Sequence, residues 1–185
     1  GYKIYSLVRR TSLDQMIRLD FLKDKNKINF LYCDLSETSR ISDFIKKIKP
    51  DLLFNLGAQS FVTYSYENPV YTDQVNNLAV INFLENIRIH SRNTRFYQAS
   101  SSEMYGSNIK NEKKLNEKSY FNPISPYSIA KLSAYHYVRL YRNSYNIFAS
   151  NGILFNHESP LRGDHFVTKK IIKGLVEIKL GIKKD

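Results

Sequence analysis

The feature that most constrains this chain is a regular alternation of short apolar runs with longer amphipathic segments. Apolar runs typical of strands lie over residues 3–8, 28–33, 52–56, 94–100 and 147–154. Apolar residues at helical spacing lie over 36–49, 69–90, 126–145 and 166–180. Nearly continuous apolar strands that alternate with helices are typical of a parallel sheet covered on both faces. We therefore expect an α/β fold with a doubly wound parallel sheet.

The length and composition allow one well-packed domain and place few demands on its environment. The 185 residues are 42% hydrophobic and 14% aromatic, which is enough to bury a core and argues against disorder. Cys33 is the single cysteine, so an internal disulfide is excluded, and its apolar neighbours favour a buried thiol over a nucleophile. No apolar run approaches the length that crosses a membrane, and no secretory signal opens the sequence. We expect a cytoplasmic location and no membrane partner.

The formal net charge of +11 raises the question of a nucleic-acid partner. The lysines occur in short clusters among apolar residues at helical spacing, and no zinc-ligand spacing or basic-helix pattern accompanies them. We interpret most of them as solvated helix and loop faces and expect no nucleic-acid partner. A basic surface also attracts anionic small molecules such as a dinucleotide or a nucleotide sugar.

Polar and glycine-bearing segments follow each predicted strand. Because the carboxyl ends of parallel strands meet at one edge of a sheet, which is where such sheets bind ligands, we expect these segments to lie together. They are Arg9–Arg10, Asp34–Leu35, Gly57–Ser60, Ser101–Glu103 and Asn156–Glu158.

Tyr127 and Lys131 are four residues apart and share one face of the predicted helix over 126–145. A nearby ammonium favours the phenolate, so this pair suits proton exchange with a sugar or alcohol hydroxyl. The alternative is a packed tyrosine followed by a solvated lysine. Ser101 and Glu103 project to one side if the chain stays extended, whereas the alternative is a helix start or a turn.

Five segments, in order, resemble the extended short-chain dehydrogenase/reductase family, and within it the 4,6-dehydratases that act on GDP-mannose. The segments are LGAQS (56–60), FYQAS (96–100), SE (102–103), SPY (125–127) and NGILFNHESP (151–160). The resemblance implies a Rossmann-like domain and an enzyme of the hydro-lyase class that converts GDP-mannose to GDP-4-keto-6-deoxymannose through an internal NADP redox cycle. It implies no metal.

The resemblance also assigns roles to the four residues named above. Tyr127 is implied to accept the proton of the sugar C4 hydroxyl while hydride leaves C4. Lys131 is implied to lower the pKa of Tyr127 and to bind the nicotinamide ribose. Ser101 is implied to orient the C4 oxygen, and Glu103 to take the C5 proton as water leaves C6.

Further residues match positions that contact the cofactor or the nucleotide sugar in this family. Two guanidiniums, Arg9 and Arg10, suit a 2′-phosphate, which favours NADP over NAD; the alternative is a solvated basic turn. The other implied cofactor contacts are Asp34, Leu35, Leu56, Gly57, Ala58, Gln59, Ser60, Tyr71, Lys131, His157 and Arg162. The implied substrate contacts are Asn156, Val167 and Lys170, of which Lys170 is equally well explained as a solvated helix lysine.

The resemblance predicts a division at residue 155 and an incomplete site. Residues 1–155 match part of an NADP-binding domain with the catalytic residues, and 156–185 match the start of the sugar-nucleotide region. Family members begin with a strand and a glycine-rich turn that holds the cofactor pyrophosphate, and the sequence shows no such turn. We therefore expect residues 1–185 alone to bind cofactor poorly and to turn nothing over.

Other hypotheses remain open at this stage. They are the same dehydration of another GDP sugar such as a GDP-heptose, an epimerase or reductase of the same fold, and a non-catalytic fragment. The family also implies a homodimer or homotetramer through the helices over 69–90 and 126–145.

Overall fold

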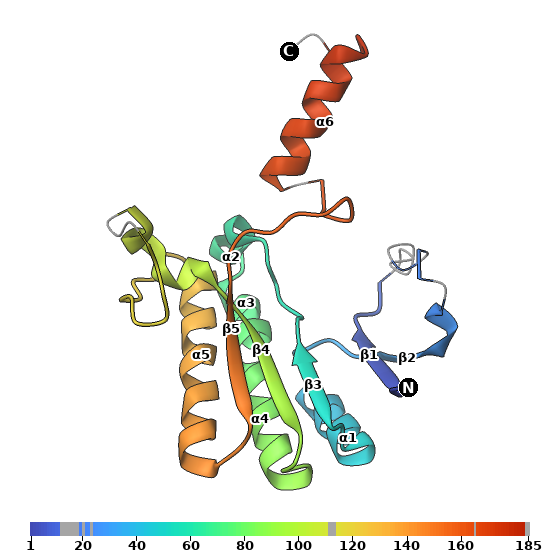
Figure 1. Ribbon diagram of the computed structural model, residues 1–185, viewed down its shortest axis with the longest axis vertical. Helices are drawn as coiled ribbons and strands as arrows, with labels where there is room; N and C mark the ends of the chain where they lie inside the picture. The colour runs from blue at the N-terminus through green and yellow to red at the C-terminus, as the bar shows by residue number, and fades with distance from the viewer. Residues whose placement is uncertain (12–18, 20, 23, 111–113, 165, 184–185) are drawn as a thin grey trace.

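The described strands form two parallel sheets. The computed structural model describes residues 1–11, 19, 21–22, 24–110, 114–164 and 166–183 (Figure 1). One sheet pairs β1 (Ile4–Val8) with β2 (Ile28–Tyr32), and the other has the order β3 (Leu52–Asn55), β4 (Arg95–Ser101), β5 (Ala149–Leu154). All ladders are parallel, with Leu52 opposite Arg95 and Phe96 opposite Ala149. The predicted α/β fold with parallel strands is confirmed.

Helices connect the strands. The short 3-10 turn η2 (Lys25–Lys27) precedes β2, and α1 (Thr38–Ile48) follows it. The helix expected over 69–90 consists of α3 (Pro69–Asp73), the π-helical turn η3 (Gln74–Leu78) and α4 (Ala79–His90), and α2 (Val62–Glu67) before it was not expected. The remaining elements are η4 (Ser102–Lys110), α5 (Pro126–Tyr145) and α6 (Val167–Lys179).

The start of α5 is fixed by its own sequence. Ser125 is the N-cap, and its side chain and that of Ser128 form a reciprocal capping box. Pro126 occupies the first helical position, where its missing N–H has no cost. The result places Tyr127 in the first turn of α5, at the carboxyl edge of β4.

The core lies between the helices and one face of the three-stranded sheet. It includes Ile41 of α1, Leu84 of α4, Phe96 of β4 and Val138 of α5, all fully buried. Cys33 is also buried there, and burial raises the pKa of its thiol to about 11, so the expectation of a structural thiol is confirmed.

The opposite face of this sheet differs from the expectation of two covered faces. Phe54 of β3 is 63% exposed and Phe148, just before β5, is 61% exposed. Residues 52 and 54 of β3 share this face with residues 95 and 97 of β4, because side chains alternate along a strand. Within the described part of the chain, helices therefore cover one face only.

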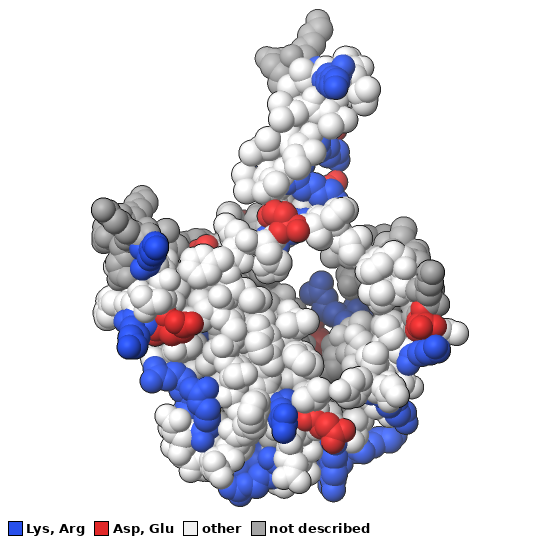
Figure 2. Space-filling model, viewed as in Figure 1, with Lys and Arg blue, Asp and Glu red and all other residues white. Residues whose placement is uncertain are grey.

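The two sheets also do not join into one. Among the described strands, β1 pairs only with β2 and β3 pairs only with β4, so β1 and β3 each have one unpaired edge. A cavity of about 1600 Å³ is lined by residues of β1, α1 and β3. Figure 2 shows an opening between the two parts of the molecule, with basic side chains along its wall.

Candidate active site

The residues predicted to be catalytic meet where β4 ends and α5 begins. Tyr127 is 8% exposed, and the Ser101 side chain at the end of β4 lies close enough to stabilise its phenolate. Glu103 and Arg162 are close enough for their charges to act on the same phenol. Lys131 follows one turn later on α5, with its ammonium 5.9 Å from the centre of the Tyr127 ring. The structure thus brings Ser101, Glu103, Tyr127 and Lys131 into one group.

The pKa of Tyr127 is raised, which differs from the expectation that Lys131 lowers it. Burial is the main cause, because the phenolate loses hydration, and the negative charge of Glu103 adds to it. The hydrogen bond to Ser101 and the positive charge of Arg162 act in the opposite direction.

Lys131 is held by the backbone of β4. It is 3% exposed, and its Nζ donates to the carbonyl oxygen of Ala99 at 2.9 Å. Burial lowers its pKa to about 8, since the ammonium is poorly hydrated there. The alternative of a solvated lysine after a packed tyrosine is therefore excluded.

Ser101 ends β4 and Glu103 lies in the next turn, so the chain does not stay extended between them and the expectation that they project to one side by strand geometry was wrong. The 3-10 segment η4 begins at Ser102, and the Ser101 hydroxyl accepts a hydrogen bond from the Glu103 N–H at 3.2 Å. Ser101 thus terminates the strand and caps the turn, which is the helix-start alternative. The two side chains still reach Tyr127, by way of the turn.

A second group joins three of the predicted cofactor contacts. The Tyr71 hydroxyl donates to Asp34 Oδ2 at 3.2 Å and accepts a hydrogen bond from Arg9 Nη1 at 3.3 Å. The pKa of Asp34 is lowered despite its partial burial, because Ser36 and Tyr71 donate to it and Arg9 lies near. Arg9, Asp34 and Tyr71 therefore form one hydrogen-bonded chain from three different elements.

The turn over 56–60 packs against Leu35 and is held by a residue that the sequence reasoning missed. A Cβ at Gly57 would lie 2.7 Å from Cδ1 of Leu35, so a side chain there would require Leu35 to shift. Asn76 of η3 accepts from the Gln59 N–H and donates to the Gln59 carbonyl, both at 2.9 Å. Its position on the buried face of a predicted helix was the available signal.

The remaining members of the turn line the large cavity between the sheets. They are Leu56, Ala58 and Ser60, with Leu35 beside them. Oε1 of Gln59 is buried with no hydrogen-bond partner among the described residues. An unpaired buried acceptor at the wall of a cavity fits a donor from a bound molecule.

Three further predicted cofactor contacts lie apart from one another. Arg10 lies over the Tyr32 ring at 5.0 Å. His157 bonds within its own segment, to the Phe155 carbonyl at 2.9 Å. Arg162 lies over the Phe166 ring at 3.6 Å and pairs with Glu158 at 3.7 Å.

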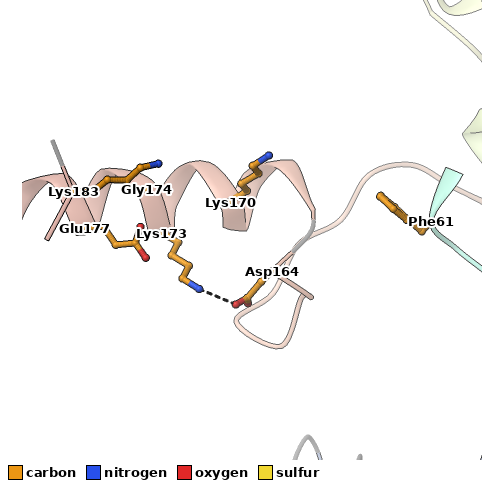
Figure 3. Close-up of a pocket in the computed structure, with 7 residues that line it drawn as sticks. All are labelled: Phe61, Asp164, Lys170, Lys173, Gly174, Glu177 and Lys183. Carbon is orange, nitrogen blue, oxygen red and sulfur yellow. Dashed lines mark hydrogen bonds and ion pairs between the residues drawn. The ribbon is translucent and has the colours of Figure 1, made fainter. Parts of the chain in front are cut away.

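The predicted substrate contacts lie between the end of β5 and the first turns of α6. Asn156 is exposed, and Val167 is the first residue of the helix. Lys170 lines a separate hollow of about 380 Å³ together with Phe61, Asp164 and Lys173 (Figure 3). Asp164 pairs with Lys173 there at 3.2 Å, so the lining has both signs of charge.

Two searches of the described residues gave negative findings. No group of three or more histidine, cysteine, aspartate or glutamate side chains is arranged to hold a metal ion in the described ranges. No helix of the described chain is both long and apolar enough to span a membrane.

Sequence comparison relates the whole chain to one family. The sequence model of the GDP-mannose 4,6 dehydratase family matches residues 1–185. A GDP-mannose 4,6-dehydratase from Yersinia enterocolitica is 44% identical over 190 residues, with 99% of this chain and 50% of the relative covered. GDP-mannose 4,6 dehydratase 2 from Arabidopsis thaliana is 41% identical over 193 residues, which covers 99% of this chain and 51% of the relative. The chain spans about half the length of the curated relatives it matches.

Structural comparison gives the same fold. The chain is similar to RMD from Pseudomonas aeruginosa complexed with NADPH, with a TM-score of 0.75, 24% identity, and coverage of 84% of this chain and 55% of that one. It is also similar to DesIV, a dTDP-glucose 4,6-dehydratase from Streptomyces venezuelae with NAD and TYD bound, with a TM-score of 0.80, 18% identity, and coverage of 95% and 53%. At these identities the likeness concerns the fold, which is the predicted Rossmann-like one.

Proposed function

Because the chain belongs to the GDP-mannose 4,6-dehydratase family, we propose that it supplies the catalytic residues of a hydro-lyase that converts GDP-mannose to GDP-4-keto-6-deoxymannose with NADP. The observation that carries the proposal is the group around Tyr127: a phenol beside the Ser101 side chain, with the carboxylate of Glu103 acting on it and the ammonium of Lys131 one turn away. A simple alcohol reductase has no task for a carboxylate beside its tyrosine.

Each side chain of this group has a place in the reaction. NADP, when bound, takes hydride from C4 of the sugar and returns it to C6. Tyr127 accepts the proton of the C4 hydroxyl, and the Ser101 hydroxyl beside it orients the C4 oxygen. Glu103 takes the C5 proton, which is acidic beside a C4 ketone, and passes it to the C6 hydroxyl that leaves as water. C5 takes up one proton as hydride reaches C6, which balances the proton that Tyr127 took from the C4 hydroxyl.

The residues along the large cavity fit a dinucleotide. The Gly57 turn lines this cavity, and the unpaired Oε1 of Gln59 offers an acceptor. Arg9, already aligned by Tyr71 and Asp34, and the neighbouring Arg10 suit a 2′-phosphate, which is the basis for proposing NADP over NAD. Leu56, Ala58, Ser60, His157 and Arg162 complete the proposed set.

The proposal divides the chain at residue 155. Residues 1–155 belong to the cofactor domain, and 156–185 begin the sugar-nucleotide region, where Asn156, Val167 and Lys170 contact the substrate. Two observations support this division: β5 ends at Leu154, and none of the residues of α6 is buried. We also propose that the full enzyme is a homodimer or homotetramer through the faces of α4 and α5, which chromatography with light scattering tests.

Product analysis tests the proposed activity. The gene product that contains these residues is incubated with NADP and either GDP-mannose or GDP-heptose, and the nucleotide sugars are identified by mass spectrometry. Loss of one water from GDP-mannose is expected. Dehydration of GDP-heptose alone would show that the proposed substrate is wrong. Formation of an epimer or a reduced sugar would show that the proposed reaction class is wrong. No change of either sugar would support a non-catalytic fragment.

A further inference from the structure

Two buried amide side chains lie on the face of the sheet that the helices cover. Asn55 of β3 is 4% exposed and Gln98 of β4 is 1% exposed. They are opposite each other in the ladder, and Asn55 Nδ2 donates to Gln98 Oε1 at 2.8 Å. Strands of a parallel sheet usually carry apolar side chains in the core. The role of these two amides therefore has to be sought in the hydrogen bonds that they make.

The second bond of Gln98 leads to Lys131. Gln98 Nε2 donates to the Ala99 carbonyl at 3.0 Å, and Lys131 Nζ donates to the same oxygen at 2.9 Å. The carbonyl has two lone pairs and can accept both donors. A buried chain therefore runs from Asn55 through Gln98 and Ala99 to the ammonium.

The Ala99 carbonyl needs these donors because its strand neighbour has ended. Residues of β4 bond alternately toward β3 and β5, and Arg95 bonds toward the β3 side, so Ala99, four residues later, faces that side as well. The ladder to β3 stops at Asn55, opposite Gln98. A buried carbonyl without a donor costs free energy, and side chains here replace the missing strand.

We propose that Asn55 and Gln98 are positioning residues that keep the Ala99 carbonyl satisfied, so that Lys131 can leave it for a ligand bound beside Tyr127. Asn55 fixes the Gln98 amide with its oxygen toward β3 and therefore its nitrogen toward Ala99. Without Gln98, departure of the ammonium would leave a buried carbonyl unpaired. The role of Lys131 toward a ligand rests on the proposed function; the hydrogen-bond chain does not.

The pKa of Lys131 can report on the hydrogen bonds that link Asn55, Gln98 and the Ala99 carbonyl. Tyr127, on the same helix, is the titratable side chain whose ring it faces, and Glu103 and Arg162 act on that phenol. Burial lowers the pKa of Lys131, and neither substitution used in the test below adds or removes a charge.

The test measures the pKa of Lys131 in residues 1–185 by NMR, from the 13Cε shift of labelled lysine. The native value is expected at about 8. In Gln98→Met the ammonium becomes the sole side-chain donor to Ala99 and is held more tightly in its charged form, so its pKa rises by about half to one unit, the size of one hydrogen bond. Asn55→Leu frees the Gln98 amide to turn away and gives a smaller rise.

A matched control and a measurement on the native chain complete the experiment. Asn86, a buried amide on α4 that bonds to Ser42 and Asn82, is changed to Leu and leaves the pKa of Lys131 unchanged. In the native chain the side-chain amide protons of Asn55 and Gln98 are expected to exchange slowly with solvent.

The outcomes separate this inference from the proposed function. An unchanged or lower pKa of Lys131 in folded Gln98→Met, or rapid exchange of the native Gln98 amide protons, would overturn the positioning role. Neither measurement involves turnover, so both stand if the gene product proves to act on another sugar.

Discussion

Two side chains of the candidate site respond to the same burial in opposite ways. Burial raises the pKa of Tyr127 and lowers that of Lys131, because burial disfavours the charged form, which is the deprotonated form of tyrosine and the protonated form of lysine. The sequence spacing predicted their shared face, but the pKa of Tyr127 is raised mainly by burial and also by Glu103. Burial depends on contacts between distant segments, which no local pattern reveals.

Lys131 should make the stability of the chain depend on pH. Its pKa is about 8 in the folded state and 10.5 when unfolded, so between these values the unfolded state binds more protons and stability increases with pH. Relative to Lys131→Met, the native chain should gain free energy of unfolding between pH 8 and pH 10.5. Urea unfolding of both proteins at intervals across this range measures the difference, in which the contributions of Cys33 and Tyr141 cancel. A flat difference would contradict the burial of the ammonium.

Glu103 should be separable from cofactor binding. In the gene product, Glu103→Gln should abolish exchange of the C5 proton of the sugar with solvent deuterium while NADP affinity stays within about twofold, since the amide cannot accept that proton. Glu117→Gln, an exposed carboxylate of the loop before α5, is the matched control and should leave exchange intact. Retained exchange in Glu103→Gln would remove this residue from the mechanism.

At the scale of elements, short-range signals determined what the sequence could predict. The helix α5 was predicted from Ser125 and Pro126, and its capping box is local chemistry. The π-helical turn η3 inside the helix over 69–90 was missed because local sequence does not show its tertiary contact. This contact consists of the two hydrogen bonds between the Asn76 side chain and the Gln59 backbone. The turn at Ser101 was offered only as an alternative, since a strand and a cap compete for the same serine.

Close packing of η4 against Asn122, in the segment before α5, requires a glycine at position 106. Gly106 has φ 51° and ψ −122°, and a Cβ there would lie 1.8 Å from the Asn122 carbonyl oxygen. Gly106→Ala should therefore lower the free energy of unfolding by about 1–3 kcal/mol. Gly174→Ala, in α6 where a Cβ meets nothing within 4 Å, should raise it by about 0.5–1 kcal/mol. Thermal unfolding of both variants tests the pair; equal effects would contradict this account of Gly106.

At the scale of the whole molecule, pairing was harder to predict than strand identity. All five predicted strands are present among the described residues, yet they form two sheets, and Phe54 and Phe148 remain exposed on an uncovered face. Apolar runs identify strands locally, whereas their neighbours and covering helices are set by contacts between distant segments. The candidate site was predictable because it follows strand ends, which order in the sequence does reveal.

The cavity between β1 and β3 bears on cofactor binding by residues 1–185. Both edges are unpaired there, and the cavity reaches the Gly57 turn and Arg9, so these proposed cofactor contacts are not tied together by one sheet. We expect these residues alone to bind NADP at least about tenfold more weakly than a GDP-mannose 4,6-dehydratase of full family length, and to give no turnover. Calorimetric titration of both with NADP measures the ratio; equal affinities would show that the split sheet does not limit binding.

Isotope transfer tests the central claim most directly. The gene product is given GDP-mannose deuterated at C4 in ordinary water, and the position of the label in the product is read by NMR. A site in which Tyr127, Glu103 and NADP act in one internal cycle predicts deuterium at C6 of the 4-keto-6-deoxy product. A dehydrated product with the label lost to solvent, or a product that keeps the label at C4, would contradict the account.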